Sequence, residues 1–169
     1  MVEYEKLSGN LAKELGVALK ARDMMLVLAE SCTGGMAAEA VTSIAGSSAW
    51  FDRGFVTYSN ASKVEMLGVS TATLEKFGAV SEDVAKEMAL GCLKSTALNN
   101  NHAHIAASIT GIAGPDGGSL EKPVGTVCFA WASINNTVTT STKYFDGNRE
   151  EIRQKATIFC LAELIQRLA

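Results

Sequence analysis

Short apolar runs alternate with helical stretches in this chain, and this alternation restricts its fold more than any other feature. Residues 24–30 (MMLVLAE) and 104–110 (HIAASIT) are almost uninterrupted apolar segments of strand length. Such runs are typical of strands buried on both faces of a sheet. In the stretches between them, apolar residues recur every three or four positions, as on one face of a helix. The pattern predicts an α/β domain with helices on both faces of the sheet.

The remaining segments complete this order of elements. Asn135 and Asn136 tolerate the positive φ angles of a tight turn, so the segments on either side predict an antiparallel hairpin. We therefore expect a three-layer α/β/α sandwich with a mixed, mostly parallel five-stranded sheet. The predicted helices are 4–21, 36–45, 60–67, 71–77, 81–98 and a last one from about residue 148. The predicted strands are 24–30, 49–59, 104–110, 124–133 and 137–145.

Length and composition limit the classes of function. A chain of 169 residues can bury a substantial core, and we expect residues 1–169 to form a single domain. The net charge of −3 argues against a nucleic-acid partner, because such proteins usually carry a basic excess. The sequence shows neither an apolar run of membrane-spanning length nor the pattern of a signal peptide. We therefore expect no membrane association and a cytoplasmic location.

Residue types that bind metals are few and scattered. His102 and His104 stand alone in the tripeptide HAH, and a zinc site would need further ligands at suitable spacing. The cysteines form no CxxC pair, so we expect reduced and mostly buried thiols. They are Cys32, Cys92, Cys128 and Cys160. The sequence therefore predicts no metal and no organic cofactor.

Two glycine-rich turns, SCTGG (31–35) and GIAGPDGG (111–118), each follow a predicted strand. In α/β sheets, ligands bind beyond the carboxyl ends of the strands. Glycine lets backbone N–H groups approach a ligand closely, and a helix N-terminus favours an anion. Neither turn matches a complete phosphate-binding motif, so an ordinary structural turn is the alternative in both places.

The two turns are expected to contribute differently to one site. We expect the first turn to bind a phosphate group, with Arg149 as a possible cationic partner; its contributing residues are Thr33, Gly34 and Gly35. A solvated Arg149 in the first turn of the last helix is the alternative. We expect the second turn to form a wall of the pocket and to contact the substrate through Thr110, Gly111 and Gly114.

Ser31 is the candidate nucleophile. At a strand-to-helix turn its hydroxyl can project from the sheet, and N–H groups of the following turn can face a developing oxyanion. A serine nucleophile needs a base, and no histidine is expected at this edge. Lys63 and Tyr58 are the alternatives, because a lysine can act as a base when burial or a nearby cation lowers its pKa. The structural alternatives are an N-cap serine, a solvated lysine and a tyrosine at the edge of the core.

Six stretches of the sequence resemble the CinA C-terminal domain family, in order and at close spacing. They are AESCTGG (29–35), GSSAWFDRGFVTYSNASK (46–63), LGV (67–69), GAVS (78–81), TGIAGPDGG (110–118) and KPVGTV (122–127). Together they extend over nearly the whole chain. Arg53 departs from the pattern, since many members have glycine there. The enzymes of this family are the nicotinamide-nucleotide amidases, also called PncC or NMN deamidases, and longer members carry an extra N-terminal domain.

The resemblance implies hydrolysis of the carboxamide of nicotinamide mononucleotide (NMN) to nicotinate mononucleotide and ammonia. It implies a serine nucleophile at Ser31, assisted by Lys63 and Tyr58. The expected partners are a small-molecule mononucleotide and further copies of the chain in a homo-oligomer. Two other functions remain open: a regulatory protein that binds a nucleotide without turnover, and a thiol hydrolase that uses Cys32.

Overall fold

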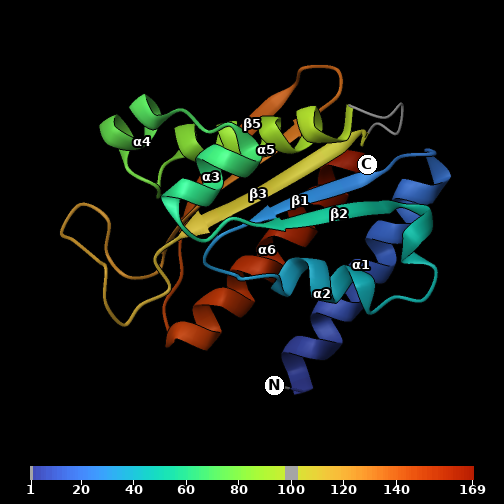
Figure 1. The fold of residues 1–169 in the computed structure, drawn as a ribbon. Coiled ribbons are helices and arrows are strands. Elements are labelled where there is room, and N and C mark those ends of the chain that lie inside the picture. The colour runs from blue at the N-terminus through green and yellow to red at the C-terminus, as the bar shows by residue number, and fades with distance from the viewer. Residues whose placement is uncertain (1, 98–102) are drawn as a thin grey trace.

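The computed structural model describes residues 2–97 and 103–169, which form a five-stranded sheet between two layers of helices (Figure 1). The order of the strands across the sheet is β2-β1-β3-β4-β5. The strands are β1 (Leu26–Glu30), β2 (Phe51–Val56), β3 (Ile105–Gly111), β4 (Thr126–Ser133) and β5 (Val138–Tyr144). The predicted three-layer α/β/α sandwich with a mixed sheet is confirmed.

Both kinds of strand pairing occur in this sheet. β1 pairs in parallel with β2 and with β3, whereas β4 pairs antiparallel with β3 and with β5. β4 therefore runs against the other strands of the sheet. The predicted hairpin joins β4 to β5, and Asn136 in its turn has a φ of 62°. The return through β4 and β5 matters for the site, because it places the start of the next helix at the edge where β1 and β3 end (Figure 1).

The helices divide between the two faces of the sheet. One face is covered by α1 (Val2–Ala21), α2 (Met36–Thr42) and α6 (Arg149–Leu168), and the other by α3 (Asn60–Leu67), α4 (Thr71–Phe77) and α5 (Glu82–Thr96) (Figure 1). A short 3-10 helix, Ser47–Ala49, lies before β2. No element was predicted over residues 46–48, and the strand predicted over 49–59 is shorter in the structure, where β2 covers Phe51–Val56.

Each helical layer encloses its own apolar core against the sheet. The side chains of Leu15, Trp50 and Leu161 are buried between β1, β3, β4 and the α1, α2 and α6 layer. Val84 and Met88 are buried on the α5 side. The four cysteines are free and buried, as expected: Cys32, Cys92, Cys128 and Cys160.

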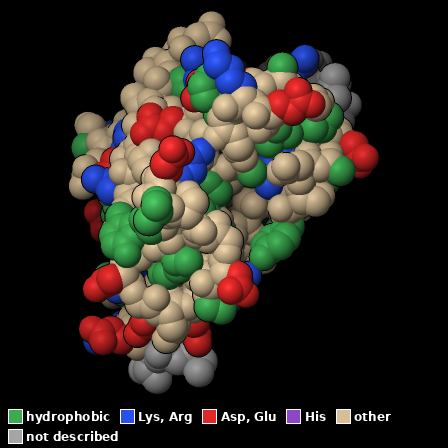
Figure 2. Space-filling view, turned by 90° about the vertical axis from the view of Figure 1, so that its left-hand side faces the viewer, with side chains coloured by type: hydrophobic (Ala, Val, Ile, Leu, Met, Phe, Trp, Pro, Cys, Tyr) green, Lys and Arg blue, Asp and Glu red, His purple; other side chains and the backbone are tan. Residues whose placement is uncertain are grey.

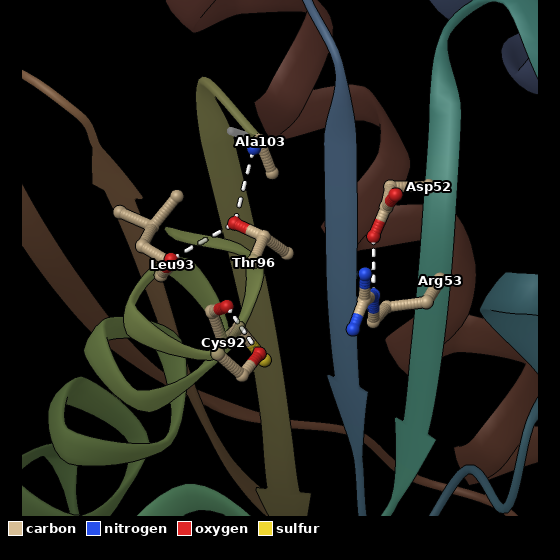
Figure 3. Close-up of polar contacts among 7 residues, drawn as sticks. Asp52, Arg53, Cys92, Leu93, Thr96 and Ala103 are labelled. Carbon is tan, nitrogen blue, oxygen red and sulfur yellow. Dashed lines mark hydrogen bonds and ion pairs between the residues drawn. The ribbon is translucent and has the colours of Figure 1, made fainter. Parts of the chain in front are cut away.

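Polar side chains near the end of the sheet where β1 and β3 begin form hydrogen bonds that stabilise the fold. The Thr96 hydroxyl donates to the carbonyl of Leu93 at 2.8 Å and accepts the N–H of Ala103 at 3.0 Å (Figure 3). The Nδ1 atom of His104 accepts the N–H of Met25 at 3.0 Å. His104 therefore has a structural partner at the start of the sheet.

Gly91 allows α5 to lie against the end of α3. A Cβ atom at Gly91 would lie 2.1 Å from the backbone carbonyl oxygen of Leu67, far inside contact distance. We expect Gly91→Ala to lower the free energy of unfolding in urea by about 1–3 kcal/mol, because the backbone must move. Gly9→Ala in α1 is the matched control, since a Cβ there meets nothing within 4 Å. Equal stability of the two variants would contradict this account of the helix packing.

Candidate active site

A cavity of about 250 Å³ opens at the edge of the sheet where β1 and β3 end. Figure 2 shows this edge of the molecule, where acidic and basic side chains are interspersed without a field of one sign. The cavity is lined by Ser31, Cys32, Tyr58, Lys63, Ala79, Val80, residues 110–114, 116 and 117, and Arg149. Turns predicted from distant parts of the sequence therefore meet at one site.

Ser31 and Lys63 are in direct contact at the floor of this cavity. Ser31 directly follows β1, and its N–H donates to the carbonyl of Ile109 at 2.9 Å. Lys63 lies in α3, and its Nζ is 3.0 Å from the Ser31 Oγ. The serine is 8% exposed and the lysine 1%. The structure thus brings together the predicted nucleophile and the predicted base, out of bulk water.

The surroundings of Lys63 suit a neutral amine. Its Nζ donates to the carbonyl oxygens of Thr57 at 2.7 Å and Tyr58 at 3.3 Å. Burial lowers the pKa of Lys63 from its ordinary value. A neutral amine has two N–H groups and one lone pair, so the two carbonyls can take both hydrogens and leave the lone pair directed at the Ser31 hydroxyl. This arrangement can accept the serine proton.

Tyr58 and Arg149 form the mouth of the cavity. The Tyr58 side chain is 60% exposed, and its hydroxyl accepts a hydrogen bond from Arg149 Nη2 at 2.9 Å. The other terminal nitrogen, Arg149 Nη1, donates to the carbonyl of Gly114 at 2.7 Å. Among the described residues, no hydrogen bond joins the Tyr58 phenol to Ser31 or Lys63. Tyr58 reaches Lys63 through its backbone carbonyl instead.

The glycines of the first turn lie away from the cavity. Thr33, Gly34 and Gly35 are absent from its lining within the described part of the chain. Thr33 is fully buried, and its hydroxyl has no hydrogen-bond partner among these residues. Of the residues predicted to bind phosphate, the structure therefore brings Arg149 to the pocket but not the three residues of this turn.

The Glu30 side chain occupies three backbone amides at the start of α2. Its carboxylate accepts the N–H groups of Gly35 at 3.0 Å, Ala37 at 3.1 Å and Ala38 at 2.8 Å. The amides that a helix N-terminus would offer to a phosphate are thus taken by a side chain of the same chain. Sequence reasoning missed Glu30. The available signal was an acidic residue at the end of a buried strand, which requires hydrogen-bond partners.

The second turn lies where it was predicted. Thr110, Gly111 and Gly114 all line the cavity. The Thr110 hydroxyl donates to the carbonyl of Ala79 at 2.8 Å, so it secures the strand end to the segment before α5. A Cβ at Gly114 would lie 2.5 Å from Val124, and Gly114 has a φ of 76°. Glycine is therefore required at this point of the wall on steric and backbone grounds.

The profile of the CinA C-terminal domain matches residues 8–168. The chain belongs to the CinA C-terminal domain family. It is 57% identical over 157 residues to a nicotinamide-nucleotide amidohydrolase PncC of Enterobacter agglomerans, covering 93% of each chain. It is 53% identical to the protein of the same name in Escherichia coli strain K12, covering 93% of this chain and 92% of the relative.

A solved structure in the same family has the same fold. It is the competence/damage inducible protein CihA of Agrobacterium tumefaciens, with a TM-score of 0.88 and 46% sequence identity. The similarity covers 95% of this chain and 94% of that one. The resemblance that the motifs predicted is therefore confirmed over nearly the full length of the chain.

The Cys32 thiol and the Arg53 guanidinium lack the properties of active-site groups in this CinA-family domain. Burial raises the pKa of the Cys32 thiol to about 12, so its nucleophilic thiolate is scarce at neutral pH. Arg53 lies on the edge strand β2 and pairs with Asp52 (Figure 3). It is not among the described residues that line the cavity. The departure from the family pattern at this position therefore falls outside the pocket.

Within residues 2–97 and 103–169, no three His, Cys, Asp or Glu side chains form a group that could hold a metal ion. His102 lies outside the described residues. Among the helices of the described residues, none combines the length and apolarity needed to cross a bilayer.

Proposed function

We propose that this domain, acting as a single unit over residues 1–169, hydrolyses the carboxamide of NMN to nicotinate mononucleotide and ammonia. The observation that carries the proposal is the 3.0 Å contact between the buried Lys63 Nζ and the Ser31 Oγ in a cavity. The 57% identity to a protein named nicotinamide-nucleotide amidohydrolase supports the choice of substrate. A hydroxyl with an adjacent base is what acyl transfer from an amide requires.

In the proposed reaction, neutral Lys63 takes the proton of Ser31 while the Oγ attacks the carboxamide carbon. We assign the resulting oxyanion to the N–H of Cys32, a residue that lines the cavity. Among the described residues it has no acceptor from another residue. The Lys63 ammonium then returns its proton to the nitrogen of the leaving ammonia, which leaves an acyl-serine. A water molecule that gives its proton to Lys63 hydrolyses this ester and regenerates Ser31.

The substrate phosphate is assigned to Arg149 at the mouth of the cavity. We place the phosphate away from the N-terminus of α2, because Glu30 accepts three of its amides. Arg149 is exposed at the first position of α6, and its guanidinium is held by the carbonyl of Gly114 and the hydroxyl of Tyr58. With the phosphate there and the carboxamide at Ser31, the glycine turn that carries Gly111 and Gly114 lies along the ribose.

The direct test is ammonia release from NMN by the purified protein, with EDTA present throughout. We expect one nicotinate mononucleotide to form for each ammonia released, and chromatography measures this product. Loss of activity in EDTA and its return with a divalent ion would contradict the serine mechanism. Binding of NMN without release of ammonia would identify a nucleotide-binding protein that lacks turnover.

Arg149→Met tests the phosphate assignment. A hydrogen bond to a charged group contributes about 1.5–3 kcal/mol, so we expect KM for NMN to rise roughly 10- to 100-fold. KM for nicotinamide riboside, which lacks the phosphate, should be high already and unchanged by the substitution. Arg22→Met is the matched control, because Arg22 follows α1 at the opposite edge and donates to the carbonyl of Ala18. If the wild type hydrolyses riboside and nucleotide with equal KM, phosphate recognition is absent.

A further inference from the structure

Glu30 connects the turn that carries Ser31 to the first turn of α2. Its side chain is 1% exposed, and the three amides that it accepts lie five to eight residues further along the chain. Gly35, the N-cap residue of α2, offers no side-chain cap of its own. A buried carboxylate is tolerated only when it is well hydrogen-bonded, so Glu30 and this turn hold each other in place.

Arg153 holds the same turn from the other side. It comes from α6, and its Nε donates to the carbonyl of Cys32 at 3.0 Å while Nη2 donates to the carbonyl of Thr33 at 2.9 Å. The described ion pairs include none between Arg153 and Glu30. The Glu30 carboxylate therefore accepts hydrogen bonds from N–H groups of the turn, and the Arg153 guanidinium donates hydrogen bonds to its carbonyl groups.

The backbone of Glu30 also reaches the base. The Glu30 carbonyl accepts the N–H of Thr57 at 2.8 Å, and the Thr57 carbonyl accepts Lys63 Nζ at 2.7 Å. The residue directly before Ser31 is thus bonded to the turn of the nucleophile and to the segment that holds the lysine. Any movement of Glu30 is transmitted to both sides of the 3.0 Å contact between Ser31 and Lys63.

We propose that Glu30 and Arg153 are positioning residues that fix the Ser31 hydroxyl against Lys63, neither of them touching the substrate. This inference deepens the proposed function and rests on it. A displacement of about 1 Å between reacting groups can cost on the order of a hundredfold in rate, so the effect is expected in kcat. Substrate affinity should change little, because Glu30 and Arg153 are absent from the described lining of the cavity.

Glu30→Gln is the decisive variant, since its amide NH₂ cannot accept the N–H groups that a carboxylate oxygen accepts. We expect kcat for NMN to fall about 10- to 100-fold with KM within about threefold of wild type. Glu39→Gln is the matched control, because Glu39 is exposed in the first turn of the same helix. It removes the same charge and should leave kcat within about twofold.

Covalent labelling of Ser31 by a fluorophosphonate, followed by mass spectrometry, separates this inference from the proposed function. The rate of labelling reports the reactivity of Ser31 whatever the substrate is, so it remains informative even if the wild type releases no ammonia. We expect it to fall with kcat in Glu30→Gln and to stay unchanged in Glu39→Gln. Labelling of folded Glu30→Gln at the wild-type rate would overturn the proposal.

Arg153→Lys keeps the test falsifiable if Glu30→Gln does not fold. A lysine keeps the charge but cannot bond both carbonyls in the fork geometry of a guanidinium. We expect about a tenfold slower labelling of Ser31, with the thermal midpoint near that of the wild type. Arg167→Lys is the control on the same helix, where Arg167 packs over Trp131 at the far edge. A wild-type labelling rate in folded Arg153→Lys would refute the positioning role.

Discussion

Ser31→Ala is expected to lower kcat for NMN hydrolysis by a factor on the order of a thousand or more. An amide is a poor electrophile, and removal of the Oγ leaves nothing to form the acyl intermediate. The Kd for NMN, measured by calorimetry, should remain close to wild type, because the proposed phosphate contact at Arg149 is intact. A low residual rate is expected from the rest of the site.

Ser43→Ala is the control for this variant, since Ser43 is exposed at the other end of α2. It should retain wild-type kcat. Near wild-type turnover of Ser31→Ala would transfer the nucleophile role to Cys32 or to a water activated directly by Lys63. Cys32 also lines the cavity, but burial raises the pKa of its thiol to about 12, so that result would also require a change in the surroundings of the thiol.

Lys63→Met is expected to cause a loss of similar size and to remove the alkaline dependence of the reaction. Lysine acts as a base only when neutral, and burial lowers the pKa of Lys63. In the wild type, kcat should therefore rise as the pH rises through this lowered pKa and level off below the range in which an exposed lysine titrates. The measurement is a pH profile of kcat at saturating NMN for both proteins.

Lys86→Met, an exposed substitution of the same kind in α5, should keep the wild-type profile. The Ser31→Ala, Lys63→Met double variant should be little slower than either single variant, because the two residues act as one unit. Multiplicative losses in the double variant would show that they act independently. A wild-type profile in Lys63→Met would assign the titrating base elsewhere.

The fold was largely predictable because its signals are local. The apolar runs around Val27 and Ala107 marked strands buried on both faces, and the Asn135–Asn136 pair marked the hairpin. Boundaries were less accurate: the helix predicted over 36–45 ends at Thr42, where the chain turns towards the 3-10 helix. Propensity alone does not resolve the last turn of a helix when tertiary contacts determine it.

The candidate site was predictable only in part. Ser31, Lys63 and the glycine turn after β3 could be placed at one edge, because parallel strands end together. The hydrogen bonds from the amides at the start of α2 to Glu30 could not be predicted from the glycines. A helix N-terminus with free amides and one with occupied amides share the same glycine pattern. The orientation of the Tyr58 phenol towards Arg149 depends on α6, which is 91 residues away in the sequence. No local pattern reports a contact of that range.

The hydrogen bonds from Arg153 to the first turn also affect the order in which the site can be assembled during synthesis. Its contact with the Cys32 carbonyl joins positions 121 residues apart. A nascent chain that has emerged only as far as β5 contains Ser31, Lys63 and Glu30 but lacks the guanidinium that holds the turn. The proposed reaction centre is therefore complete only once α6 packs onto the finished sheet, and a chain interrupted before that helix is expected to leave it unassembled.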